Sequence, residues 1–127
     1  MNPLKIFLLF VTLFGLFFIF QTDSVFSQMK NGDEITLIGE VVDANCYLHG
    51  GMKGNDHKQC AIACAKAGAP LAILTDEGVL YFPIVSEGKN PNKDFMEHIA
   101  AKVEVKGQYY SYSGTKGIFV SSVKKAE

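Results

Sequence analysis

All three cysteines and two of the three histidines of the chain lie within one short stretch, residues 46–70. The stretch reads CYLHGGMKGNDHKQCAIACAKAGAP. Thiolates and imidazoles are the side chains that bind zinc and copper in proteins, and thiolates also carry out disulfide exchange. Residue types and spacing therefore point to a soft-metal site or a thiol-redox site in this stretch.

A short helix is expected to begin near Asp56 and to end near Gly68. Asp56 is a suitable N-cap, and Gln59 stands three residues later, which is the spacing of a capping box. Gly68 supplies a C-terminal stop, and Pro70 prevents the helix from continuing. The residues before this helix are rich in glycine, so we expect them to form a loop that folds back on it.

His57, Cys60 and Cys64 would share one face of this helix, within a stripe about 60° wide. Cβ atoms at i and i+4 are about 5–6 Å apart, whereas a disulfide needs about 3.5–4.5 Å, so a Cys60–Cys64 disulfide inside the helix would be strained. Two thiolates that each reach about 2.3 Å to a shared ion tolerate that spacing. The predicted metal ligands are Cys46, His57, Cys60 and Cys64, with His49 as the alternative histidine and Met52 as an additional thioether donor.

The identity of the ion and the use of the thiols stay open at this point. Thiolate, imidazole and thioether together favour Cu(I), whereas three cysteines and one histidine suit structural Zn²⁺ equally well. In a second interpretation Cys60 and Cys64 form a thiol–disulfide redox pair, with His57 activating Cys60. In a third, Cys46 forms a disulfide with Cys60 or Cys64, and the protein is a stapled interaction domain without chemistry.

Other features suggest little further chemistry. Asp43, three residues before Cys46, could orient a metal ligand by hydrogen bonding to it without binding the ion itself. An aspartate that ends a strand is, however, usually a turn former. No catalytic triad, phosphate-binding loop or paired-carboxylate motif stands out, so we do not expect an enzyme. The formal net charge is −1, from 12 basic and 13 acidic side chains. This balance argues against nucleic acid as a partner and gives no reason to expect docking on an anionic membrane.

Residues 1–27 have the features of a signal peptide. Lys5 precedes an apolar run at 6–20, and Val25 and Ser27 occupy the −3 and −1 positions of a small-residue cleavage site before Gln28. The run is shorter than the about 20 apolar residues of a spanning helix. We therefore expect export to the periplasm or secretion, the alternative being an uncleaved N-terminal membrane anchor. In such compartments thiols are paired, so an odd number of cysteines leaves one thiol that needs another role.

Residues 28–127 are expected to form one domain with five strands, at 35–43, 71–75, 79–85, 102–112 and 118–123. Gly39 would form a bulge or sharp coil that lets the long first strand serve two halves of a barrel. A short helix is expected from 91 or 92 to 101, with Asn90 or Asn92 as its cap. The order predicts a mainly β fold, a five-stranded Greek-key barrel of the OB type, with a Cys-bearing helical insertion at 44–70 after strand 1 and a helix between strands 3 and 4. A small β-sandwich is the alternative.

The pattern in and around this insertion resembles that of a group of small exported bacterial proteins with an OB-like barrel. The matching residues are Asp43-Ala-Asn-Cys46-Tyr47, His57-x-x-Cys60-Ala61-x-x-Cys64-Ala65 and Gly68-x-Pro70. The likeness covers about residues 35–123 and implies a fold rather than a function, because that group has no settled activity. The Cys-x3-Cys spacing is also similar to that of copper-handling proteins of cytochrome oxidase assembly, but those have a thioredoxin fold, and the parallel is one of spacing alone.

Overall fold

The structure is a computed structural model that describes residues 2–4 and 28–127. The expected signal peptide, apart from residues 2–4, lies outside the described residues and stays a prediction. Within the described part of the chain, no helix is both long enough and apolar enough to cross a membrane.

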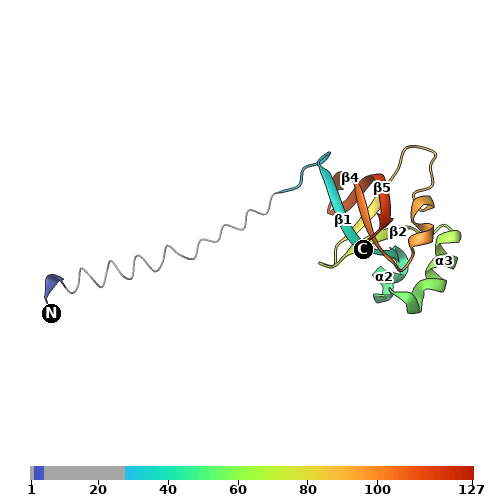
Figure 1. The fold of residues 1–127 in the computed structure, drawn as a ribbon, viewed down its shortest axis with the longest axis horizontal. Coiled ribbons are helices and arrows are strands. Elements are labelled where there is room, and N and C mark those ends of the chain that lie inside the picture. Colours follow the sequence, from blue (N-terminus) through green and yellow to red (C-terminus); the bar gives the residue numbers. More distant parts are fainter. Residues whose placement is uncertain (1, 5–27) are drawn as a thin grey trace.

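Five strands form one closed barrel (Figure 1), and they are β1 (Glu34–Asp43), β2 (Leu71–Thr75), β3 (Leu80–Ile84), β4 (Lys102–Tyr112) and β5 (Thr115–Lys125). The order around the barrel is β1-β2-β3-β5-β4, and β4 pairs with β1 to close it. Neighbouring strands are antiparallel except β3 and β5, which run parallel. The prediction of a mainly β domain built on five strands is confirmed.

The first strand, β1, forms backbone pairs with both β2 and β4, as its length and its central glycine suggested. Gly39 pairs with Val103 of β4 and also with Thr75 of β2. A Cβ atom at this position would lie 2.5 Å from the carbonyl oxygen of Leu74, so only glycine allows the two strands to approach this closely. The register shift in the sheet lies elsewhere, between Lys106 and Gly107 of β4.

The core is filled by alternate strand residues and by side chains from outside the barrel. Val103 and Val105 of β4 are fully buried, as their alternation with lysine and glutamate predicted. Phe95 and Ile99, predicted to face the core, are each 1% exposed. The expected helix that carries Phe95 is a shorter 3-10 helix, η3 (Lys93–His98), with Asn92 at its N-cap position.

The last hairpin is longer than the sequence predicted. Ser113 and Gly114 form a two-residue turn with φ values of 50° and 80°, so β5 begins at Thr115 rather than at 118. The strand also continues to Lys125, because Lys124 pairs with Glu104 of β4. Both ends of this strand are polar and exposed, and hydrophobic periodicity therefore gave no sign of them.

Candidate metal centre

The residues between β1 and β2 form helices that lie together at one end of the barrel (Figure 1). The first, α2 (Ala44–Gly50), was expected to be a loop. Asp43 caps it, because its Oδ1 accepts hydrogen bonds from the backbone N–H groups of Asn45 (2.9 Å) and Cys46 (3.2 Å). Gly51 ends the helix in the left-handed conformation, with φ 68°. The signal for α2 was thus an aspartate cap followed by a glycine stop.

The second helix of the insertion, α3 (Lys58–Lys66), begins differently from the prediction. His57 occupies its N-cap position and makes no side-chain capping bond, and a 3-10 turn, η2 (Asn55–His57), precedes it. The expectation that Asp56 caps this helix is therefore wrong, because Asp56 lies inside that turn. The Gly54 N–H at its start donates to Glu40 Oε1 of β1 (2.6 Å), which ties the turn to the barrel.

Hydrogen bonds fix both ends of the insertion to each other and to the barrel. The Ala44 N–H donates to the Pro70 carbonyl (3.0 Å), so the chain leaves and re-enters the barrel at adjacent points. Asn92, which is 5% exposed, accepts from the Leu71 N–H (3.0 Å) and donates to the Ala69 carbonyl (2.8 Å). The side chain of Asn92 thus holds the end of the insertion instead of capping its own helix.

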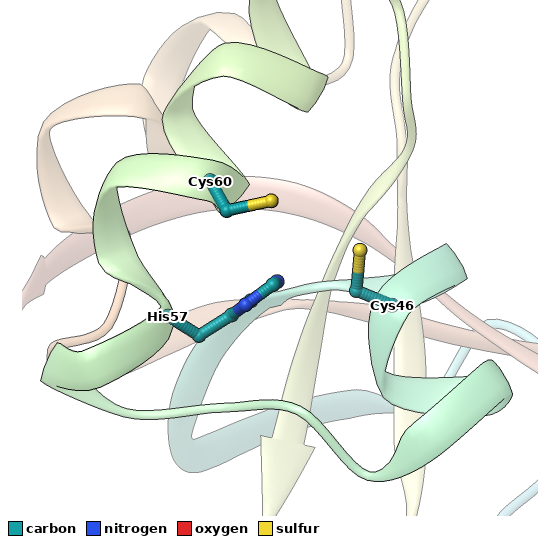
Figure 2. A group of neighbouring side chains, drawn as sticks. All are labelled: Cys46, His57 and Cys60. Atoms are coloured by element: carbon teal, nitrogen blue, oxygen red, sulfur yellow. The ribbon is translucent and has the colours of Figure 1, made fainter.

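Figure 2 shows Cys46 of α2 facing His57 and Cys60 across the space between α2 and α3. One donor atom from each of the three side chains lies within 4.8 Å of the other two. Ligand atoms about 2.3 Å from a tetrahedral ion are about 3.8 Å apart, so a small closure of this space would bring all three onto one ion. His57 Nε2 is buried and has no hydrogen-bond partner among the described residues.

Cys64 falls into a second group of donors, together with Asp43 and Cys46. Their donor atoms again lie within 4.8 Å of one another, and Cys46 is common to both groups. The Asp43 side chain belongs to a residue only 1% exposed, and its Oδ2 has no hydrogen-bond partner of ordinary geometry within the described part of the chain. The structure therefore gives Asp43 a more direct place in the site than the supporting role that its sequence position suggested.

The surroundings of two thiols favour their protonated form. The pKa of Cys46 is raised to about 12, chiefly because the Asp43 carboxylate attracts the thiol proton, and further by burial and by neighbouring negative charge. Burial is the largest cause of the raised pKa of Cys64, followed by its contacts with Asp43 and Cys60. All three cysteines, which lie in the described residues, are free. An ion that binds Cys46 or Cys64 must displace a proton.

The two additional donors suggested by the sequence lie outside these groups. His49 is exposed on the last turn of α2 and belongs to neither group. Met52 is 42% exposed, and the end of its side chain lies against Gly50. His57, rather than His49, is therefore the histidine that the fold brings to the cysteines.

Comparison of the chain with protein-family models, with curated proteins and with solved structures finds no match. No relative therefore supplies a function for this site. Its chemistry is inferred from the donors that the fold brings together and from their surroundings.

Proposed function

We propose that the protein is an exported metal-binding module that holds a thiophilic ion, Zn²⁺ or Cu(I), between α2 and α3. The observation that carries this proposal is the buried Nε2 of His57, which has no hydrogen-bond partner in the described part of the chain and belongs to the residue grouped with Cys46 and Cys60. Leaving a buried polar atom unpaired costs about 1–3 kcal/mol. An ion bound by this imidazole and the two thiolates would supply the missing interaction.

Two thiolates and one imidazole leave one position of a tetrahedral ion open. Cys60 is exposed, so a ligand of a partner protein or water could reach an ion that Cys60 binds. Sites with an open position exchange ligands more readily than closed structural sites. We infer that the protein accepts and passes on an ion rather than using one only as a structural clamp.

We infer further that the scaffold is a barrel of the OB type and that residues 1–27 direct export. The strand order β1-β2-β3-β5-β4, with β3 and β5 parallel, supports the first inference. The small-residue cleavage pattern before Gln28 supports the second. Protein partners of the module would thus be sought outside the cytoplasm.

The thiol-redox and disulfide-staple alternatives have less support from the site. In the redox pair Cys64 would have to react as a thiolate, and the raised pKa of Cys64 disfavours that form. A disulfide from Cys46 to either cysteine of α3 would leave the buried Nε2 of His57 without an interaction. A bound ion accounts for the thiols and the imidazole together.

Replacing His57 with alanine tests the proposal, and His49→Ala is the matched control. We expect His57→Ala to weaken Zn²⁺ and Cu(I) binding by about tenfold or more, because it removes one of three ligands. His49→Ala should change either affinity less than about twofold, since His49 lies outside both donor groups. The measurement is competition against a chelator of known affinity with the reduced protein. Equal effects of the two substitutions, or wild-type protein that binds neither ion stoichiometrically, would refute the proposal.

A further inference from the structure

We propose that Asp43, Cys46 and Cys64 form a second, inner position for a zinc ion, which shares the Cys46 sulfur with the outer position at His57 and Cys60. This inference rests on the proposed metal-binding function and extends it. The donor atoms of the three inner residues lie within 4.8 Å of one another, as do those of the outer position. The two groups have only Cys46 in common, so each position has two donors of its own.

The clearest evidence for the inner position is that the two oxygens of Asp43 differ in their hydrogen bonding. Oδ1 caps α2 through two backbone N–H groups. Oδ2 is buried, receives no such bond within the described residues and belongs to the side chain grouped with Cys46 and Cys64. The cap fixes the carboxylate, and its second oxygen is left for another partner.

The side chains beside this carboxylate are the thiols of Cys46 and Cys64, and we expect a cation that replaces their protons to bind all three groups. The ion pairs of the described residues involve Asp76, Glu97 and Glu104, and none of them reaches Asp43. A carboxylate that is 1% exposed is costly unless a positive charge or hydrogen bonds compensate it, and both backbone hydrogen bonds of Asp43 go to Oδ1. A metal ion would supply that charge and would also bind the two sulfurs beside it.

The ligand atoms of the inner position, one carboxylate and two thiolates, favour Zn²⁺ over Cu(I). Zn²⁺ accepts carboxylate oxygen at about 2.0–2.2 Å together with thiolate sulfur at about 2.3 Å, whereas Cu(I) favours soft ligands alone. When Zn²⁺ binds here, the thiol protons of Cys46 and Cys64 pass to solvent. Two thiolates, one carboxylate and the ion then leave a net charge of −1. An ion moving inward from the outer position would exchange His57 and Cys60 for Asp43 and Cys64 while remaining bound to Cys46.

The test removes the outer donors and asks whether an ion still binds. We expect the variant His57→Ala/Cys60→Ser, kept reduced, to bind one Zn²⁺ per chain by native mass spectrometry. Co²⁺ used as a probe should show the charge-transfer absorption of thiolate ligands. Adding Asp43→Asn should weaken Zn²⁺ binding about tenfold or more, because asparagine still caps α2 but no longer offers a charged oxygen. Adding Asp56→Asn, a change at an exposed acid outside both groups, should alter the affinity less than about twofold.

Each contrary result has a distinct meaning. A folded His57→Ala/Cys60→Ser variant that binds no stoichiometric ion overturns the inner position while leaving the outer one intact. Binding that Asp43→Asn does not weaken also overturns it, since the carboxylate is then no ligand. Wild-type protein without a bound ion overturns the proposed function as well. If circular dichroism shows that the double variant is unfolded, the Asp43→Asn comparison is made in Cys60→Ser alone, where the same weakening is required.

Discussion

Asp43 takes part in three interactions at the junction between the barrel and the site. Its backbone pairs with Leu71 of β2, its Oδ1 caps α2, and its carboxylate is grouped with Cys46 and Cys64. The sheet register therefore fixes the carboxylate before any ion binds. This explains why a strand-end aspartate, usually a turn former, has a strong effect on the thiols.

Replacing Asp43 with asparagine should lower the pKa of Cys46 from about 12 towards its ordinary value of 9.0. The reason is that the negative carboxylate favours the neutral thiol, while asparagine keeps the cap. The measurement is a pH titration of thiolate absorbance in a variant with Cys46 as the only cysteine. Asp56→Asn in the same variant should leave the titration unchanged, and an unchanged titration in Asp43→Asn would contradict the role given to the carboxylate.

The same raised pKa sets the direction of a change in stability with pH. The folded chain holds the Cys46 proton more tightly than the unfolded chain, in which the pKa is near 9.0. This contribution to metal-free stability is complete below pH 9 and is lost as the pH rises towards about 12. The loss should be smaller in Asp43→Asn, as urea denaturation at increasing pH would show.

The sequence predicted which donor residues the fold brings close together better than it predicted how they are grouped. Residue type and helical spacing were enough to select Cys46, His57 and Cys60, which the fold brings together. The same helical reasoning placed Cys64 beside His57, whereas the structure groups it with Asp43. That grouping depends on the proximity of the end of β1 to the last turn of α3, and no local pattern in the sequence contains it.

At the scale of the elements, the strands were predictable and the insertion was only partly so. Strands β1 and β4 have largely alternating buried residues and β2 is buried throughout, and the observed bounds of all three differ from the prediction by at most one residue. Helix α2 escaped prediction because it is short and is followed by several glycines, which suggested a loop. Its stability comes from the Asp43 cap and from packing on the barrel, and isolated helices of this length are not stable.

Asn92 is the side chain that attaches the end of the insertion to the barrel, and Asn92→Ala tests this. We expect a loss of about 2–4 kcal/mol in the free energy of unfolding, because the Leu71 N–H and the Ala69 carbonyl lose their buried partner. Asn31→Ala is the matched control, since Asn31 also makes two bonds to backbone, at Ser111, but is exposed. Its loss should be below about 1 kcal/mol by urea denaturation, and equal losses would contradict the importance of burial.

At the scale of the whole molecule, the site is held by elements that contact the barrel but do not belong to its sheet. Ala61 and Ala65 of α3 are buried in the barrel core, and α2 is held by its cap, by the Ala44–Pro70 bond and by packing of Ala44 and Tyr47 in a second hydrophobic cluster. An ion bound by residues of both helices would therefore connect α2 to α3, which have few contacts with each other in the metal-free protein. Its effect should be local to the insertion.

Hydrogen exchange measured with and without Zn²⁺ tests this expectation. Amides of α2 and η2 should exchange at least about tenfold more slowly with the ion bound, while those amides of β4 and β5 that exchange through local fluctuations should change little. At a free Zn²⁺ concentration 100 times the dissociation constant, global stability should rise by about 2.7 kcal/mol. Cys46→Ser, which removes the donor common to both groups, should abolish both effects. A site confined to the insertion would be contradicted if amides that exchange through local fluctuations were slowed equally throughout the barrel.

The position of the insertion also affects how the barrel closes during folding. Asp43 and Leu71 are paired across β1 and β2, so residues 44–70 occupy the place of a hairpin turn. Loop-closure entropy rises by about 0.6 kcal/mol for each doubling of loop length, so this loop costs about 1.7 kcal/mol more than a turn of about four residues. An ion that joins α2 to α3 early would shorten the effective loop. Metal binding would then speed the pairing of β1 with β2, and the ion would act on the folding of the barrel as well as on the site.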